Sequence, residues 1–366
     1  NQTYTVVKVT QPTASGTTTV SGVRTVNFGN PNLEPERGEE FELGFEGGFL
    51  DNRLAVDFTY YNKRTDNLLQ AVSVAPSAGF LSGRTENLGD IRNTGVELLL
   101  TASVLQGERF GWESQLNLAT NRNRLLSFGQ EGMIRSVLSG QAYGAVQENR
   151  AGYPLGGFWA QLPVRDAGGA YTFNSRGVPV IDTAFTYLGS PAPTREIGFS
   201  NTFTLFRNVR VFAQLDYKAG NKIFNYKEYN RCRFQLNCER VNDIRVLAPA
   251  NAADSAFARD VSIYRGQAVT VTGGTANLFA PYIEDGDFLK LRDVSVSFTI
   301  PQRYLSFTRA TDATLTLAGH NLATLWTAYS GIDPEVNTYG GRNFVRVDAY
   351  AMPQNRRLSA SINLNF

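Results

Sequence analysis

The chain has 366 residues, of which 42% are hydrophobic and 12% aromatic, and its formal net charge at pH 7 is +2. It contains no apolar run of about 18 residues, which excludes a helical membrane protein. The near-neutral charge gives no indication of a nucleic-acid partner, and the many Phe, Tyr and Gly residues favour strands with frequent turns over helices.

Apolar and polar side chains alternate in nine segments of the chain. Such a period of two is typical of a strand with one apolar and one polar face. In chain order the predicted strands cover residues 41–46, 54–61, 96–103, 112–118, 197–205, 211–218, 293–300, 313–317 and 357–366. The last strand shows the pattern most clearly, because Leu358, Ile362 and Phe366 share one face while Ser359 and Asn363 lie on the other.

The connections between these segments alternate strictly between short and long. The short ones lie near 48–53, 106–111, 206–209 and 301–310, and the long ones near 71–90, 128–194, 220–287 and 327–354. An up-and-down sheet with all its long loops at one end is the layout of a transmembrane β-barrel, with tight periplasmic turns and long extracellular loops. We therefore predict an all-β, antiparallel, up-and-down transmembrane β-barrel.

The number of predicted strands adds a second expectation. Nine antiparallel strands cannot close on themselves, because the first and last would meet in parallel, and an open sheet edge is not tolerated in lipid. The chain also begins without Met and without a signal peptide. We expect it to be the carboxy-terminal part of a larger barrel whose other strands are missing from this sequence.

Several motifs resemble the SusC/RagA family of TonB-dependent outer-membrane transporters, and the resemblance runs from about residue 28 to residue 366. They share the order and spacing that this family shows. The motifs are 30–36 (NPNLEPE), 151–158 (AGYPLGGF), 188–193 (LGSPAP), 282–291 (YIEDGDFLKL), 319–322 (GHNL) and 331–337 (GIDPEVN).

The resemblance implies a barrel of about 22 strands around an amino-terminal plug. The nine strands would then be the last nine, with 1–36 as an extracellular loop segment, 37–366 as the carboxy-terminal part of the barrel, and the plug absent. It also implies the cell outer membrane of a Gram-negative bacterium as the location. The implied partners are the TonB–ExbB–ExbD complex acting through the missing amino-terminal part, a SusD-like surface lipoprotein, outer-membrane lipid, and an oligosaccharide or peptide substrate. No cofactor and no nucleic acid is expected.

Aromatic residues of the predicted long loops are candidate substrate-binding residues. Their rings could stack on sugar faces or apolar solutes, while packing within the loops and an interfacial aromatic girdle are the alternative uses. The candidates are Tyr153, Phe158, Trp159, Tyr226, Tyr229, Trp326 and Tyr329.

Cys232 and Cys238 are the only cysteines and lie in one polar stretch. We expect a small surface disulfide, consistent with an oxidising exterior. With His320 as the only histidine, no zinc-type metal site is predicted, and His320 is expected to be a structural polar residue.

Two acidic segments are candidate calcium sites. Glu284, Asp285 and Asp287 have suitable oxygen ligands, but Gly286 also makes the segment an ordinary turn before a strand. Asp333 and Glu335 lie within the motif 331–337, and the calcium interpretation is discounted for them in the same way. No metal site is therefore predicted at either place.

No arrangement of nucleophile, base and orienting group is visible, so no enzymatic activity is expected. The prediction is a TonB-dependent nutrient importer of the SusC type, which takes up an oligosaccharide or peptide-like substrate through a plugged barrel. The alternatives are a passive porin or adhesin barrel, and a soluble β-sandwich that binds glycans. A plug and TonB box upstream would decide against the porin, and solubility without detergent would favour the sandwich.

Overall fold

The computed structural model describes the chain in segments separated by gaps. These segments are 4–13, 16–25, 30–72, 84–129, 135–136, 146–169, 171–173, 179–235, 237–238, 267–269, 275–305, 310–339 and 345–366.

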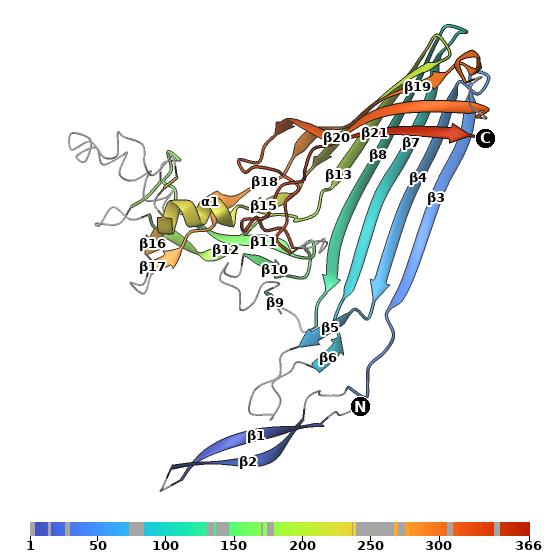
Figure 1. Ribbon diagram of the computed structural model, residues 1–366. Coiled ribbons are helices and arrows are strands. Elements are labelled where there is room, and N and C mark those ends of the chain that lie inside the picture. The colour runs from blue at the N-terminus through green and yellow to red at the C-terminus, as the bar shows by residue number, and fades with distance from the viewer. Residues whose placement is uncertain are drawn as a thin grey trace.

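One antiparallel sheet of nine strands dominates the structure and forms the long, curved wall seen in Figure 1. Each strand pairs with its neighbours in chain order, so the sheet is an up-and-down meander. Its strands are β3 (Arg37–Phe49), β4 (Leu54–Asp66), β7 (Asp90–Gln106), β8 (Phe110–Ser127), β13 (Arg195–Leu205), β14 (Val209–Ala219), β19 (Phe288–Ile300), β20 (Asp312–Thr327) and β21 (Arg357–Asn365). The nine predicted strands and the predicted fold class are confirmed.

The wall is open along its two outer strands. Among the described residues, β3 pairs only with β4, and β21 pairs only with β20. No helix in the described part of the chain is long and apolar enough to cross a membrane.

Several strands continue beyond their predicted ends, and they extend furthest toward the long connections. β7 begins at Asp90 and β8 continues to Ser127, where the apolar alternation predicted strands of 96–103 and 112–118. The added residues include Arg92, Arg122 and Arg124. Both faces of these extensions carry polar side chains. The alternation of apolar and polar residues therefore ends before the backbone hydrogen bonding between the strands ends.

The short connections are tight turns that hold the register of the hairpins. Between β13 and β14, Phe206 and Arg207 both have positive φ, at 50° and 67°. Two successive residues in this left-handed region match the type I′ turn, whose twist suits a hairpin. The turn between β3 and β4 likewise places Leu50, Asp51 and Asn52 at φ values of 55° to 62°.

The outer face of the wall is apolar and exposed. Val296 and Phe298 of β19 are 41% and 40% exposed, and Leu317 of β20 is 54% exposed. Other large apolar side chains exposed on the wall are Phe41, Leu43, Phe45, Phe199, Leu358, Ile362 and Leu364. An apolar surface of this extent marks contact with another apolar phase or partner. The wall therefore has the inside-out character of a membrane barrel.

Smaller elements gather at the long-loop end of the wall (Figure 1). A four-stranded sheet joins β9 (Arg135–Ser136), β10 (Gln147–Asn149), β11 (Gly157–Pro163) and β12 (Ile181–Gly189). The remaining elements are the pairs β1 (Tyr4–Thr13) with β2 (Gly16–Thr25), β5 (Leu69–Val72) with β6 (Arg84–Asn87), β15 (Lys222–Phe224) with β18 (Ile283–Asp285), β16 (Gln267–Val269) with β17 (Thr275–Asn277), and the helix α1 (Tyr226–Asn230).

The hydrophobic core lies within this loop layer rather than within the wall. Phe158 of β11, Phe224 of β15 and Tyr229 of α1 are buried in one cluster with Tyr282 and Val347. Segments far apart in the sequence therefore meet here, and the loops have a core of their own.

The two faces of β19 give a direct test of the register. We expect Val296→Arg in the full-length protein to impair folding into a bilayer, because a cation on the lipid face costs about 2–4 kcal/mol near the midplane. Ser295→Arg, one residue away on the opposite face, serves as the matched control and should fold nearly as well as the wild type. Folding yield into lipid vesicles measures both, and equal effects of the two substitutions would contradict the register.

Candidate functional site

A charged network joins the loop segment after β20 to the inner face of the wall. Lys290 of β19 is 1% exposed, and its Nζ lies 2.7 Å from Asp333 Oδ1 and 2.7 Å from Glu335 Oε2. Burying an ammonium group requires such partners, because desolvation of an unpaired charge is costly. The two carboxylates thus hold segment 333–335 against β19.

Arg292 extends the network to a second strand. The register of β19 shifts at this residue with both neighbouring strands. Arg292 is an extra residue opposite β14, whereas on the other side it faces Asn321 and Leu322 of β20. A β-bulge of this kind re-aims a side chain. The Arg292 guanidinium donates to Asp216 Oδ2 of β14 at 2.7 Å and 3.0 Å, and to Glu335 Oε2 at 2.7 Å. Two strands and one loop therefore share one cation.

The network keeps Glu335 ionised. Burial alone would raise the pKa of Glu335, but the hydrogen bonds and charges of Arg292 and Lys290 outweigh burial and lower this pKa to about 2. Because the folded pKa lies below the ordinary value, the contribution of Glu335 to stability is present above pH about 4.5 and is lost as the pH falls toward 2.

A second set of contacts fastens the loops to one another. Asn225 caps α1 by accepting from the Glu228 amide at 3.0 Å, and its own amide donates to Glu284 Oε1 at 3.0 Å. Glu284 also accepts from the amide and hydroxyl of Ser330, at 2.8 Å and 2.9 Å. The hydroxyl of Tyr329 donates to Asp348 Oδ2 at 2.7 Å, and burial together with the Asp348 charge raises the pKa of Tyr329 far above its usual range.

The acidic residues weighed as calcium ligands are engaged by protein donors. Besides Glu284, Asp285 pairs with Lys222 at 2.7 Å and Asp287 accepts from the Gly220 amide at 2.8 Å. Asp333 and Glu335 bind Lys290. These carboxylates attach segments to one another, which is a structural use of the acidic motifs.

The aromatic candidates fall into two groups. Phe158, Trp159, Tyr229 and Tyr329 are between 0% and 4% exposed, so their rings pack against protein. Burial also raises the pKa of Tyr229 to about 12. This placement corresponds to the loop-packing alternative.

The other three candidates retain accessible surface. Tyr153 is 38% exposed and contacts Trp159 edge-on, with ring centroids 4.7 Å apart. Trp326 is 49% exposed and lies opposite Leu289, on the outer face of the wall, which matches the girdle alternative. Tyr226 is partly buried against the loop core.

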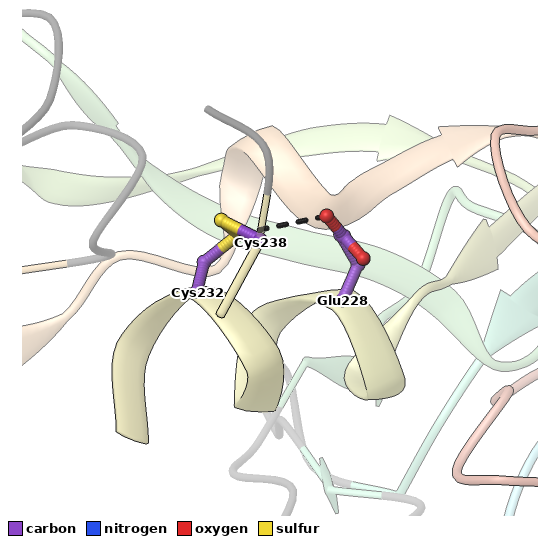
Figure 2. Close-up of side chains that lie close together, drawn as sticks. All are labelled: Glu228, Cys232 and Cys238. Atoms are coloured by element: carbon purple, nitrogen blue, oxygen red, sulfur yellow. Dashed lines mark hydrogen bonds between the residues drawn. A yellow bond between two sulfur atoms is a disulfide. The ribbon is translucent and has the colours of Figure 1, made fainter. Parts of the chain in front are cut away.

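Cys232 and Cys238 form a disulfide beside α1 (Figure 2). Its expected surface position is wrong, because the cysteines are 1% and 0% exposed and belong to the loop core. The reason is that α1 continues into a π-helical turn, Arg231–Gln235, which directs Cys232 inward. Glu228 lies beside them, with Oε1 3.6 Å from Cys232 Sγ. A metal cannot use these sulfurs as thiolates while they are bonded to each other.

His320 pairs its Nδ1 with Asp293 across the β19–β20 ladder. The expected structural role fits this position, since both residues belong to the inner face of the wall.

The Lys290–Arg292 network is the functional feature that sequence reasoning missed. The sequence does contain an indication of this network. Lys290 and Arg292 are two cations in a strand that otherwise alternates small polar and apolar residues, and buried cations require nearby carboxylates. Chemically, the network can fix the position of a loop at the mouth of the barrel. The described residues bring together no set of nucleophile and base.

Comparison with known proteins identifies the family. The family described as "TonB dependent receptor-like, beta-barrel" matches residues 3–322. The chain belongs to this family. Among its relatives, TonB-dependent receptor P26 of Formosa agariphila is 27% identical over 95% of this chain, and TonB-dependent receptor SusC of Bacteroides thetaiotaomicron is 22% identical over 92%. The resemblance to SusC-type proteins is thereby confirmed.

The fold agrees with a solved structure. The chain is similar to the structure titled "Structure of the RagAB peptide transporter", with a TM-score of 0.75, 20% identity, and coverage of 100% of this chain and 38% of that one. The chain spans only 37% of the length of P26 and 32% of SusC.

The anchoring role of Lys290 can be tested by its removal. We expect Lys290→Met in the full-length protein to loosen segment 328–339, because breaking a buried ion pair leaves an uncompensated charge at a cost of about 3–5 kcal/mol. Amide hydrogen exchange in this segment should accelerate by about two to three orders of magnitude. Lys63→Met is the control, since the Lys63–Glu40 pair is exposed. Unchanged exchange after Lys290→Met would show that the network does not hold the loop.

Proposed function

We propose that the complete protein is a TonB-dependent nutrient importer of the SusC type in the outer membrane, and that this chain forms the carboxy-terminal part of its barrel. The observation that carries the proposal is that the wall is arranged in the reverse way to a water-soluble protein. Its apolar side chains face outward, and the hydrophobic core lies in the loop layer at one end. Membership of the TonB-dependent receptor family supports an energised importer over a passive porin.

Substrate class and partners follow from the relatives and are part of the proposal. SusC is a named relative, and the similar solved structure is of a peptide transporter. We infer an oligosaccharide or peptide-like substrate, a SusD-like lipoprotein over the long loops, and the TonB–ExbB–ExbD complex acting on a plug. Segment 1–36, which contains the β1–β2 hairpin, is assigned to the extracellular side.

Tyr226 is our proposed substrate-contacting residue among the aromatic candidates. It combines partial exposure with a place on the first turn of α1, in the loop layer. Tyr153 and Trp326 are assigned instead to the outer surface, and the four buried rings to packing.

Growth of the source bacterium tests the proposal. We expect deletion of the gene to abolish growth on at least one oligosaccharide or peptide pool as sole nutrient, and inactivation of TonB to abolish the same growth. Restored full-length protein should rescue growth only in cells with functional TonB. Rescue in cells without TonB would establish a passive pore. Purification of the full-length protein from the soluble fraction without detergent would contradict the proposed place in the membrane.

A further inference from the structure

Four arginines share the outer face of the wall just beyond its apolar band. Arg92 of β7 has the same strand parity as Val96, and Arg195 of β13 has the same parity as Ile197 and Phe199. Arg122 and Arg124 continue the face of β8 that carries Leu116 and Leu118. All four arginines are exposed. We call Arg92, Arg122, Arg124 and Arg195 the outer arginine cluster.

The register brings these cations close together. Arg92 lies directly opposite Arg124, and Arg64 of β4 lies directly opposite Arg92. Thr120, which precedes Arg122 on the same face, pairs with Arg195. Like charges directly opposite one another destabilise an antiparallel pair. A bound anion would relieve this repulsion.

Two adjoining hollows open over the cluster. The larger, of about 590 Å³, is lined by Arg122, Arg124 and Arg195 together with the rings of Tyr153 and Tyr187. The smaller, of about 350 Å³, is lined by Arg92, Arg122, Arg124, Tyr60 and Val96. Both hollows therefore have a basic part and an apolar or aromatic part.

The protein supplies few acidic partners on this face. Arg64 pairs with Asp66 at 2.6 Å and Asp90 at 3.4 Å, at the edge of the cluster. Within the described part of the chain, Arg122, Arg124 and Arg195 form no ion pair.

Two other acids of these strands face the opposite way. Glu97 and Glu196 have the opposite strand parity, and Glu196 pairs with Lys218 on the inner face. This part of the outer face keeps a net positive charge, because its acids Asp66 and Asp90 pair with Arg64 and no described acid pairs with Arg122, Arg124 or Arg195.

We propose that the outer arginine cluster binds the phosphate groups of an anionic outer-membrane glycolipid, whose acyl chains lie along the apolar band. This inference rests on the proposed membrane location of the wall. The planar guanidinium group pairs with phosphate through two parallel hydrogen bonds, and basic clusters beside a membrane-spanning segment bind anionic headgroups. A soluble anion would match the arginines but leave the adjoining apolar surface without a partner, so an amphiphile fits the whole surface better.

Binding of bisphosphorylated lipid A by the full-length protein tests the proposal. The protein is placed in nanodiscs of neutral phospholipid, and lipid A is titrated and counted by native mass spectrometry. The triple variant Arg122→Gln/Arg124→Gln/Arg195→Gln should weaken binding by about tenfold or more. The matched control, Arg109→Gln/Arg207→Gln/Arg303→Gln, removes the same charge at the short-turn end and should bind as the wild type does.

Two further ligands complete the experiment. Lipid A stripped of its phosphates should bind no more tightly to the wild type than to the triple variant. Inorganic phosphate at millimolar concentration should compete weakly. Equal lipid A binding by the wild type and the triple variant, or equal binding of the stripped lipid, would overturn the proposal. Full competition by inorganic phosphate would assign the cluster to a free anion instead.

Failure of this inference is distinguishable from failure of the proposed function. A wild-type protein that does not insert into nanodiscs would refute the membrane wall itself. One that inserts and supports TonB-dependent growth, yet shows no preference for phosphorylated lipid, would refute only the lipid site.

Discussion

Lateral pairing of backbone groups is the constraint on which the rest of the structure depends. In a hydrocarbon environment every N–H and C=O must find its partner within the protein, and the nine-stranded ladder supplies those partners from strand to strand. Once the register is fixed, each side chain is committed to one face, because a slip of one residue would move the whole set to the other. The left-handed turns at Leu50–Asn52 and Phe206–Arg207 help to fix that register.

The apolar belt, the polar interior and the basic rim all follow from this register, which assigns each side chain to one face of the wall. Along β8, one face proceeds from Leu116 and Leu118 to Arg122 and Arg124. In the proposed membrane location, this change from apolar to basic along a single face would mark the boundary between the lipid chains and the headgroups. The opposite face carries polar groups such as Asn117 and Asn123 toward the interior.

Because the wall places its apolar groups outward, the largest buried cluster among the described residues is made by the loops themselves. Phe158, Phe224 and Tyr229 supply it, and Lys290 and Arg292 connect it to the wall through Asp333 and Glu335. The loop layer is therefore tied to specific strands rather than free above the mouth.

The sequence was sufficient for the strands and their order. Wherever a strand separates an apolar from a polar environment, apolar and polar residues alternate along it, as Val294, Val296 and Phe298 do with their polar neighbours. Beyond the apolar band both faces are polar, and the extensions of β7 and β8 left no such signal. The strict alternation of short and long connections predicted the topology, because hairpin turns and loops differ so much in length.

The contacts of the site were harder to predict for a different reason. Lys290 meets Asp333 and Glu335 across 43 and 45 residues, and a local pattern does not specify a pairing at that separation. The aromatic residues were identified by their place in the long loops, but composition does not reveal whether a ring such as Phe158 points into a core. The burial of the Cys232–Cys238 pair depended on the same packing.

Spin-label accessibility along β19 in the membrane-embedded full-length protein tests the account most directly. Labels are placed singly at consecutive positions from 294 to 299, and collision with oxygen, which partitions into lipid, is compared with collision with a water-soluble nickel complex. With lipid on one side of the wall and water on the other, oxygen contact should peak at 294, 296 and 298, and nickel contact at 295, 297 and 299. A profile without this alternation, or one in which all six positions are shielded from both reagents, would contradict a wall with lipid on one side and water on the other.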